Sequence, residues 1–112
     1  MAYALTLTAN YAVYTFNSML PTDIVAVRHA LGLTQAELAQ TLDVHVLTVS
    51  KWERGILTPS ARNGAIFRRL ERLDGVAARV VGEAVKVALA DAGGLVAYYV
   101  LLGAALPPRA EP

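Results

Sequence analysis

Cysteine is absent from this 112-residue chain, which excludes disulfide bridges, thiolate metal sites and a cysteine nucleophile. Charge is also scarce, because Asp, Glu, Lys and Arg make up 17% of the residues, against a usual fraction of about 25%. The formal net charge is only +1, so no global field points to nucleic acid, a membrane or an acidic substrate. A charge-driven partner must therefore bind a local patch of the protein.

Features of a secreted or membrane protein are missing as well. The first residues contain no basic stretch followed by an apolar run, as a signal peptide would, so we expect a cytoplasmic protein. Residues 87–106 have about the length of a bilayer span. They include Asp91, Gly93 and Gly94, however, so contact with a membrane is not expected.

Hydrophobic residues, by contrast, make up 55% of the sequence, which argues against intrinsic disorder. The length fits one small domain with extensions. We divide the chain into a β-prone N-terminal extension at 1–21, a helical domain at 22–73 and a C-terminal apolar segment at 76–106. The first segment is called β-prone because Tyr3, Leu5 and Leu7 fall on one side of an extended chain.

Helix start and stop signals punctuate residues 22–73. Thr22 is placed to cap a first helix that ends at Gly32. Thr34 and Glu37 fit a capping box, in which each side chain accepts a hydrogen bond from the backbone amide of the other residue. This pair predicts a second helix that runs to Leu42.

Two further helices are expected in the same domain. The third covers roughly residues 46–54 and ends at Gly55, and the fourth follows a turn and cap at 58–60. Val49 and Trp52 should face inward on the third helix. The fourth helix has apolar residues at helical spacing, namely Ile66, Phe67, Leu70 and Leu73, and a basic outer face, namely Arg68, Arg69 and Arg72.

The segment at 76–106 begins with the pattern of an amphipathic helix. Its apolar face would hold Val81, Val85 and Ala88, and its polar face Arg79, Glu83 and Lys86. Gly93 and Gly94 interrupt the pattern. The rest of the segment, at 95–106, fits either a buried strand or a short buried helix, and periodicity does not decide between them.

Three stretches of the helical domain together resemble the Xre family of lambda-repressor-like, Cro/CI-type DNA-binding proteins. They are residues 33–39 (Leu-Thr-Gln-Ala-Glu-Leu-Ala), residues 48–55 (Thr-Val-Ser-Lys-Trp-Glu-Arg-Gly) and the Pro-Ser pair at 59–60. The resemblance covers residues 22 to about 73, a little under half of the chain. It implies a mainly α fold, a four-to-five-helix lambda-repressor-like helix-turn-helix domain, to which this chain would add short β-prone N- and C-terminal extensions. It also implies binding to double-stranded DNA, with the third helix in the major groove.

The resemblance further implies which residues contact DNA. Gln35 matches the family position that hydrogen-bonds a phosphate and braces the reading helix. Lys51 can reach guanine or a phosphate, and Arg54 is expected to bind phosphate. The complete set of expected DNA-binding residues is Gln35, Val46, Leu47, Thr48, Ser50, Lys51 and Arg54.

Two features depart from the family pattern. Asp43 and His45 stand where a turn glycine and a small polar cap are usual, although Asp43 can adopt the left-handed conformation at modest cost. Val46 and Leu47 occupy positions that are often polar. These two side chains fit contacts with thymine methyl groups, packing against the N-terminal segment, or a helix that binds protein instead of DNA.

The domain at 22–73 carries seven basic and five acidic side chains, a light positive charge for a DNA-binding domain. Such a domain normally dimerises to read the two half-sites of a pseudo-palindromic operator, so we expect a homodimer. Strands from the two ends of the chain are expected to pair and to form the dimer interface. The alternative is that these ends form an intramolecular cap on the core.

The predicted function is a sequence-specific transcriptional regulator, most simply a dimeric repressor, located in the cytoplasm at the nucleoid. One alternative is an Xre-type antitoxin that autoregulates its operon and neutralises a toxin partner. Another is a protein-interaction or membrane-associated adaptor. An enzyme is not expected, because His29 and His45 lack a second ligand at metal spacing and no nucleophile or acid-base constellation is visible. No catalytic residue, metal or cofactor is therefore predicted.

Overall fold

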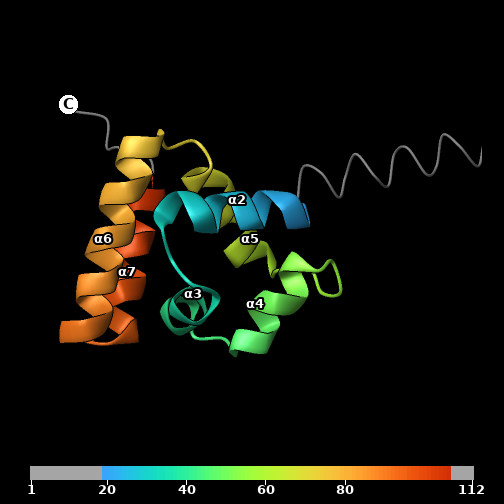
Figure 1. The fold of residues 1–112 in the computed structure, drawn as a ribbon, viewed down its shortest axis with the longest axis horizontal. Helices are drawn as coiled ribbons and strands as arrows, with labels where there is room; N and C mark the ends of the chain where they lie inside the picture. The colour runs from blue at the N-terminus through green and yellow to red at the C-terminus, as the bar shows by residue number, and fades with distance from the viewer. Residues whose placement is uncertain (1–18, 107–112) are drawn as a thin grey trace, which may run out of the picture.

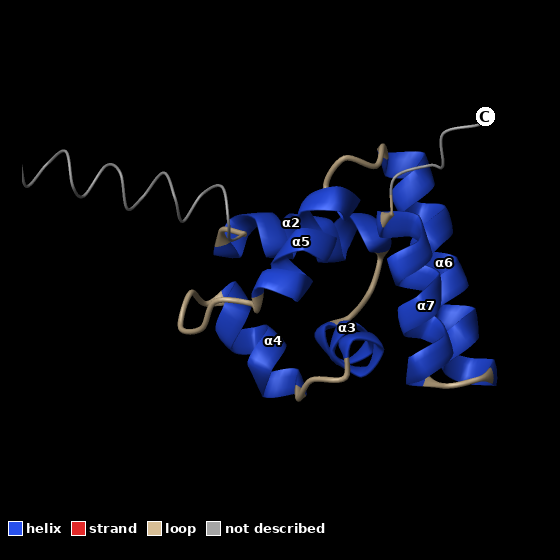
Figure 2. Ribbon diagram, turned by 180° about the vertical axis from the view of Figure 1, so that it is seen from behind, coloured by secondary structure: helices blue, strands red, loops and turns tan. Residues whose placement is uncertain are grey.

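The computed structural model describes residues 19–106, and these residues form six helices and no strand (Figures 1 and 2). The predicted N-terminal extension at 1–21 lies outside the described residues except for its last three, and Pro21 already belongs to the first helix. The helices are α2 (Pro21–Leu31), α3 (Gln35–Leu42), α4 (Val46–Glu53), α5 (Ala61–Leu70), α6 (Gly75–Asp91) and α7 (Gly94–Ala105). The first four fill the predicted helix-turn-helix domain.

Helix α2 starts one residue before the predicted cap. Pro21 takes the first helical position, and Leu20 precedes it with an extended backbone and no side-chain cap. The proline ring fixes φ near the helical value and has no N–H to satisfy, so it begins the helix without a capping side chain. The prediction of Thr22 as the cap was therefore wrong, whereas Gly32 ends the helix as predicted, with φ 72°.

Helix α3 begins with the predicted capping box. The Thr34 hydroxyl accepts a hydrogen bond from the Glu37 amide at 3.0 Å, and the Glu37 carboxylate accepts one from the Thr34 amide at 2.8 Å. The helix ends at Asp43, which adopts the left-handed conformation with φ 56°. Aspartate tolerates this conformation because its short side chain can hydrogen-bond locally, so the turn forms without glycine.

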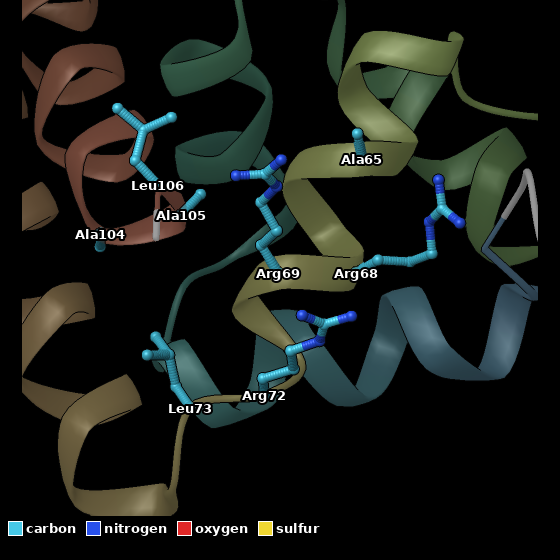
Figure 3. A pocket seen from close by; sticks show the side chains of 8 residues that line it. All are labelled: Ala65, Arg68, Arg69, Arg72, Leu73, Ala104, Ala105 and Leu106. Carbon is cyan, nitrogen blue, oxygen red and sulfur yellow. The ribbon is translucent and has the colours of Figure 1, made fainter. Parts of the chain in front are cut away.

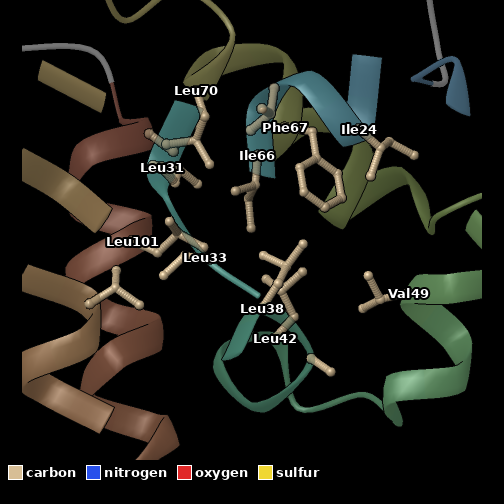
Figure 4. Close-up of a cluster of buried hydrophobic side chains, with 14 of the residues drawn as sticks. Ile24, Leu31, Leu33, Leu38, Leu42, Val49, Ile66, Phe67, Leu70 and Leu101 are labelled. Atoms are coloured by element: carbon tan, nitrogen blue, oxygen red, sulfur yellow. The ribbon is translucent and has the colours of Figure 1, made fainter. Parts of the chain in front are cut away.

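The core is built from side chains of all six helices, and Figure 4 shows many of them converging in one cluster. Val49 and Trp52 are buried as predicted, and the Trp52 ring packs edge-on against Phe67 with 5.8 Å between ring centroids. Such aromatic pairs add to the stability gained by burying the rings. The largest fully buried side chains are Phe67, Ile24, Leu31, Leu38, Leu101, Val49, Val85 and Thr41.

Residues 94–105 form a helix, which settles the choice that the sequence left open and makes the prediction of a β-prone C-terminal extension wrong. Ala97, Leu101 and Ala105 recur every four residues and are all buried, so one face of α7 belongs to the core. Helix α7 packs against α3, α5 and α6. Because the strand is absent, residues 95–106 cannot supply one half of the predicted strand pairing.

Helices α6 and α7 form a hairpin that lies against the helix-turn-helix domain, at the end of the molecule away from α4 (Figures 1 and 2). Two glycines allow the close contact. A Cβ atom at Gly82 would lie 1.6 Å from the carbonyl oxygen of Leu31, and one at Gly94 would lie 2.7 Å from that of Gln40. The hairpin is therefore fitted to the backbones of α2 and α3 and acts as an intramolecular cap on the core.

Candidate nucleic-acid interface

Helix α4 presents the surface that the sequence predicted for DNA. Its N-terminus is capped by His45, whose Nδ1 accepts a hydrogen bond from the Leu47 amide at 3.1 Å. Its inner side is held by Val49 and Trp52, which are 0% and 4% exposed. A helix anchored in this way keeps the direction of its outer side chains fixed.

An ion pair fixes the C-terminal end of α4 to α2. Arg28 Nε and Nη2 donate to the two carboxylate oxygens of Glu53 at 2.6 and 2.9 Å, a bidentate contact. Arg28 Nη1 also donates to the Leu33 carbonyl at 3.0 Å. The side chains of Arg28 and Glu53 are only 13% and 7% exposed, so solvent screens this pair weakly.

Gln35 joins the same network from the first turn of α3. Its Nε2 donates to Glu53 Oε1 at 3.0 Å, so three helices meet at one carboxylate. Burial of Glu53 raises its pKa, but the hydrogen bonds from Arg28 and Gln35 and the charges of Arg28 and His29 together outweigh burial, and the pKa lies below its ordinary value. Glu53 is therefore ionised at neutral pH, as the ion pair requires.

The predicted reading residues lie mainly on the outer side of α4. Leu47, Lys51 and Arg54 are exposed, as is Val46, and Ser50 is half-buried. At about 100° per residue these five positions fall within an arc of about 140°. Thr48 is half-buried and lies just beyond this arc, next to the buried side. The structure therefore brings these five predicted residues onto one face, with Thr48 at its margin, whereas Gln35 lies on α3.

Arg54 and Gln35 each keep hydrogen-bonding groups that the described residues do not use. The Arg54 Nε donates to the carbonyl oxygen and hydroxyl of Ser50 at 3.3 and 3.2 Å, which lays the side chain along α4. Both terminal nitrogens of the guanidinium remain for an anion. Gln35 uses one of its two N–H groups on Glu53 and retains the other.

Sequence reasoning gave no role to Arg28 and Glu53. Glu53 appeared only within the resembling stretch, and Arg28 only as one positive charge. Their pairing spans 25 residues, and no local pattern announces it. Sequence reasoning also gave no role to Ile56 and Leu57, which are 58% and 46% exposed in the loop after α4.

Other kinds of site find no support in the described part of the chain. Among residues 19–106, no three His, Asp or Glu side chains are grouped so that they could hold a metal ion. In the same range, no helix is both long and apolar enough to cross a bilayer.

Comparison with known families agrees with this geometry. Residues 24–64 match the family model described as Helix-turn-helix (HTH_3), a stretch that contains α3, the turn and α4 with most of α2 and the start of α5. No curated protein and no solved structure matches the chain. Residues 24–64 thus form a Cro/C1-type, Xre-like helix-turn-helix domain, a DNA-binding module.

Proposed function

We propose that this protein is a sequence-specific transcriptional regulator that binds double-stranded DNA as a homodimer, most simply as a repressor. The observation that carries the proposal is the outer face of α4, which is exposed while the helix itself is held by Val49, Trp52 and the Glu53 network. A helix of this width enters the major groove of B-DNA, which is about 12 Å wide. Fixed side chains are what base recognition needs.

Val46 and Leu47 are proposed to read thymine methyl groups. They are 38% and 56% exposed, so no described residue covers them fully. Apolar contact with the thymine methyl is an established form of direct readout. Lys51 and Ser50 lie beside them and supply hydrogen bonds to base edges or phosphates.

Gln35 and Arg54 are proposed to bind the DNA backbone. Each has an unused donor, and the two residues lie at the N-terminus of α3 and the C-terminus of α4. Hydrogen bonds to phosphate set the register and orientation of a protein on the duplex. Thr48 is proposed to contribute only at the edge of the interface, because it is half-buried.

The dimer is proposed to form through the C-terminal hairpin. Val76, Val80 and Val87 are 77%, 62% and 59% exposed on one side of α6. They fall within an arc of about 40° on the helix. The stripe they form is narrow and apolar, and the exposed Glu83 borders it about 20° outside this arc. A second copy that packs on this stripe would remove it from water and double the number of DNA contacts.

The test is selection of bound duplexes from a random pool, followed by footprinting of the selected sequence. We expect an enriched pseudo-palindrome with half-sites about one helical turn apart. Protection should fall on the major groove of each half-site. A pool without enrichment would contradict the proposal.

The same apolar stripe favours a second candidate, an antitoxin whose C-terminal hairpin binds a toxin. This candidate also uses α4 to autoregulate an operon. Self-association of the purified protein distinguishes the two candidates. If the stripe binds a toxin and not a second copy, the free protein should be a monomer. Co-expression with the product of an adjacent small reading frame would then give a complex that variants of Val80 disrupt.

A further inference from the structure

A groove between α5 and α7 is lined by arginine and by apolar side chains. It consists of two adjoining cavities of about 550 and 570 Å³, which share Ala65, Arg69, Ala105 and Leu106. Both volumes lie in the range of small-molecule sites. The groove is built from elements other than α4, so it is separate from the proposed DNA-reading helix.

The first cavity is the basic end of the groove. Arg68, Arg69 and Arg72 line it, no carboxylate does, and none of the three makes an ion pair within residues 19–106. Figure 3 shows Arg69 beside Ala105 and Leu106 at the end of α7, with Arg72 in the turn that follows α5. The Nε of Arg68 is buried and has no hydrogen-bond partner among the described residues.

The stability of α5 does not require three arginines near its C-terminus. Basic residues in the last turn of a helix are stabilised by its dipole, which accounts for one or two of them. No carboxylate lines this end of the groove beside them. The nearest carboxylate in sequence, Glu71, does not line the groove. Burial and the charge of Asp23 raise its pKa, and the charge of Arg72 opposes this rise.

The second cavity is the apolar end. Its walls include Ile66, Tyr98 and Leu102, and its remaining arginine besides Arg69 is Arg62, which stacks over the Tyr98 ring at 5.1 Å. Arg62 is thus already engaged by an aromatic face. The groove therefore changes along its length from positive to apolar.

We infer that this groove binds a small amphiphilic anion, whose carboxylate or phosphate group contacts Arg69 and Arg72 and whose apolar tail lies along Tyr98, Leu102 and Leu106. Arginine suits the head group because it binds a carboxylate through two parallel hydrogen bonds. The basic end of the groove complements a negative charge, and the apolar walls of the other end fit a hydrocarbon tail. Together they favour an amphiphile over a simple ion.

The test is calorimetric titration of the full-length protein with decanoate below its micelle concentration. We expect one saturable site per chain, with weaker binding of inorganic phosphate, decanol and decyltrimethylammonium. Arg69→Gln should lower the affinity for decanoate at least tenfold, and Leu106→Ser should lower it several-fold. Arg79→Gln, on the exposed side of α6, is the matched control and should leave the affinity unchanged.

Several results would overturn the inference. If decanoate and decyltrimethylammonium bind with equal affinity, the arginines do not recognise the charge of the head group. If phosphate binds as tightly as decanoate, the apolar tail does not contribute to binding. A loss of operator affinity in Arg69→Gln would assign the arginine to DNA, whereas failure of decanoate alone would leave the proposed DNA reading intact.

Discussion

At the scale of single residues, Glu53 determines how the reading helix is held. Its carboxylate receives hydrogen bonds from Arg28 of α2 and Gln35 of α3, so the end of α4 is tied to both neighbouring helices. Loss of the carboxylate would leave the largely buried Arg28 guanidinium without its partner, which costs more than the pair itself contributes. Glu53 thus links the stability of the domain to the position of the DNA-binding surface.

Replacement of Glu53 by Gln should lower the free energy of unfolding by about 2 kcal/mol at neutral pH, below the value for a fully buried pair. Because the pKa of Glu53 is depressed in the folded state, its contribution is present above the pKa of the unfolded chain and is lost as the pH falls through the folded pKa. The difference between wild type and Glu53→Gln should therefore shrink below about pH 5. Urea denaturation at pH 7 and pH 3 measures both values, and a pH-independent difference would contradict the role of the charge.

Lys51→Ala and Arg54→Ala should weaken binding to the selected operator without changing the melting temperature, because both side chains are exposed. A lost phosphate contact should reduce the slope of log affinity against log salt concentration by about one per contact. Fluorescence anisotropy at several salt concentrations measures this slope. Arg79→Ala removes an exposed charge from α6 and serves as the control, and unchanged affinity in both α4 variants would disprove the docking of this helix.

The sequence was a good guide to residues whose partners are close in the chain. The Thr34 and Glu37 capping box, the left-handed Asp43 and the inward Val49 and Trp52 all depend on contacts or periodicity within one or two turns. Thr22 failed as a cap because Pro21 could begin the helix just as well. The pairing of Arg28 with Glu53 could not be predicted, since it depends on how α2 and α4 cross. Which of the exposed α4 residues bind DNA stays a prediction.

At the scale of elements, the hairpin of α6 and α7 depends on two backbone contacts. Its helices approach α2 and α3 so closely that Gly82 and Gly94 have no space for a side chain. Sequence reasoning placed the amphipathic helix at the start of this segment but could not choose between strand and helix after Gly93. The uncharged run carries no polar face to reveal a period, and only its packing between α3, α5 and α6 makes it a helix.

Gly82→Ala should destabilise the protein by about 3 kcal/mol, because its Cβ would overlap a backbone carbonyl that cannot move without shifting α2. Gly103→Ala is the matched control on α7, where an added Cβ atom would meet nothing within 4 Å. This second change should stabilise the helix by about 0.5–1 kcal/mol, since alanine has the higher helix propensity. Thermal unfolding followed by circular dichroism measures both, and equal effects of the two changes would refute the close contact.

At the scale of the whole molecule, the two ends of the protein present different surfaces. Helix α4 lies at one end with its outer face free, and the α6 and α7 hairpin lies at the other (Figures 1 and 2). The large hydrophobic fraction of the sequence is only partly used by the core, because Val76, Val80 and Val87 remain exposed on the hairpin. In the proposed dimer, the exposed side of the hairpin joins the two copies and each copy contributes one α4 to the DNA contact.

Val80→Glu should convert the dimer to a monomer and reduce operator affinity at least tenfold, because a buried carboxylate without a partner opposes packing of the two α6 helices. The monomer should retain its helical content, since Val80 is 62% exposed within one chain. Ala26→Glu places the same charge on an exposed position of α2 and should leave self-association unchanged. Sedimentation velocity at micromolar concentration distinguishes these outcomes. The proposal fails if the wild-type protein sediments as a monomer or if the Val80→Glu variant sediments as a dimer. Either result would show that the stripe on α6 does not join two copies. The apolar side of the hairpin would then be the binding surface for a different protein.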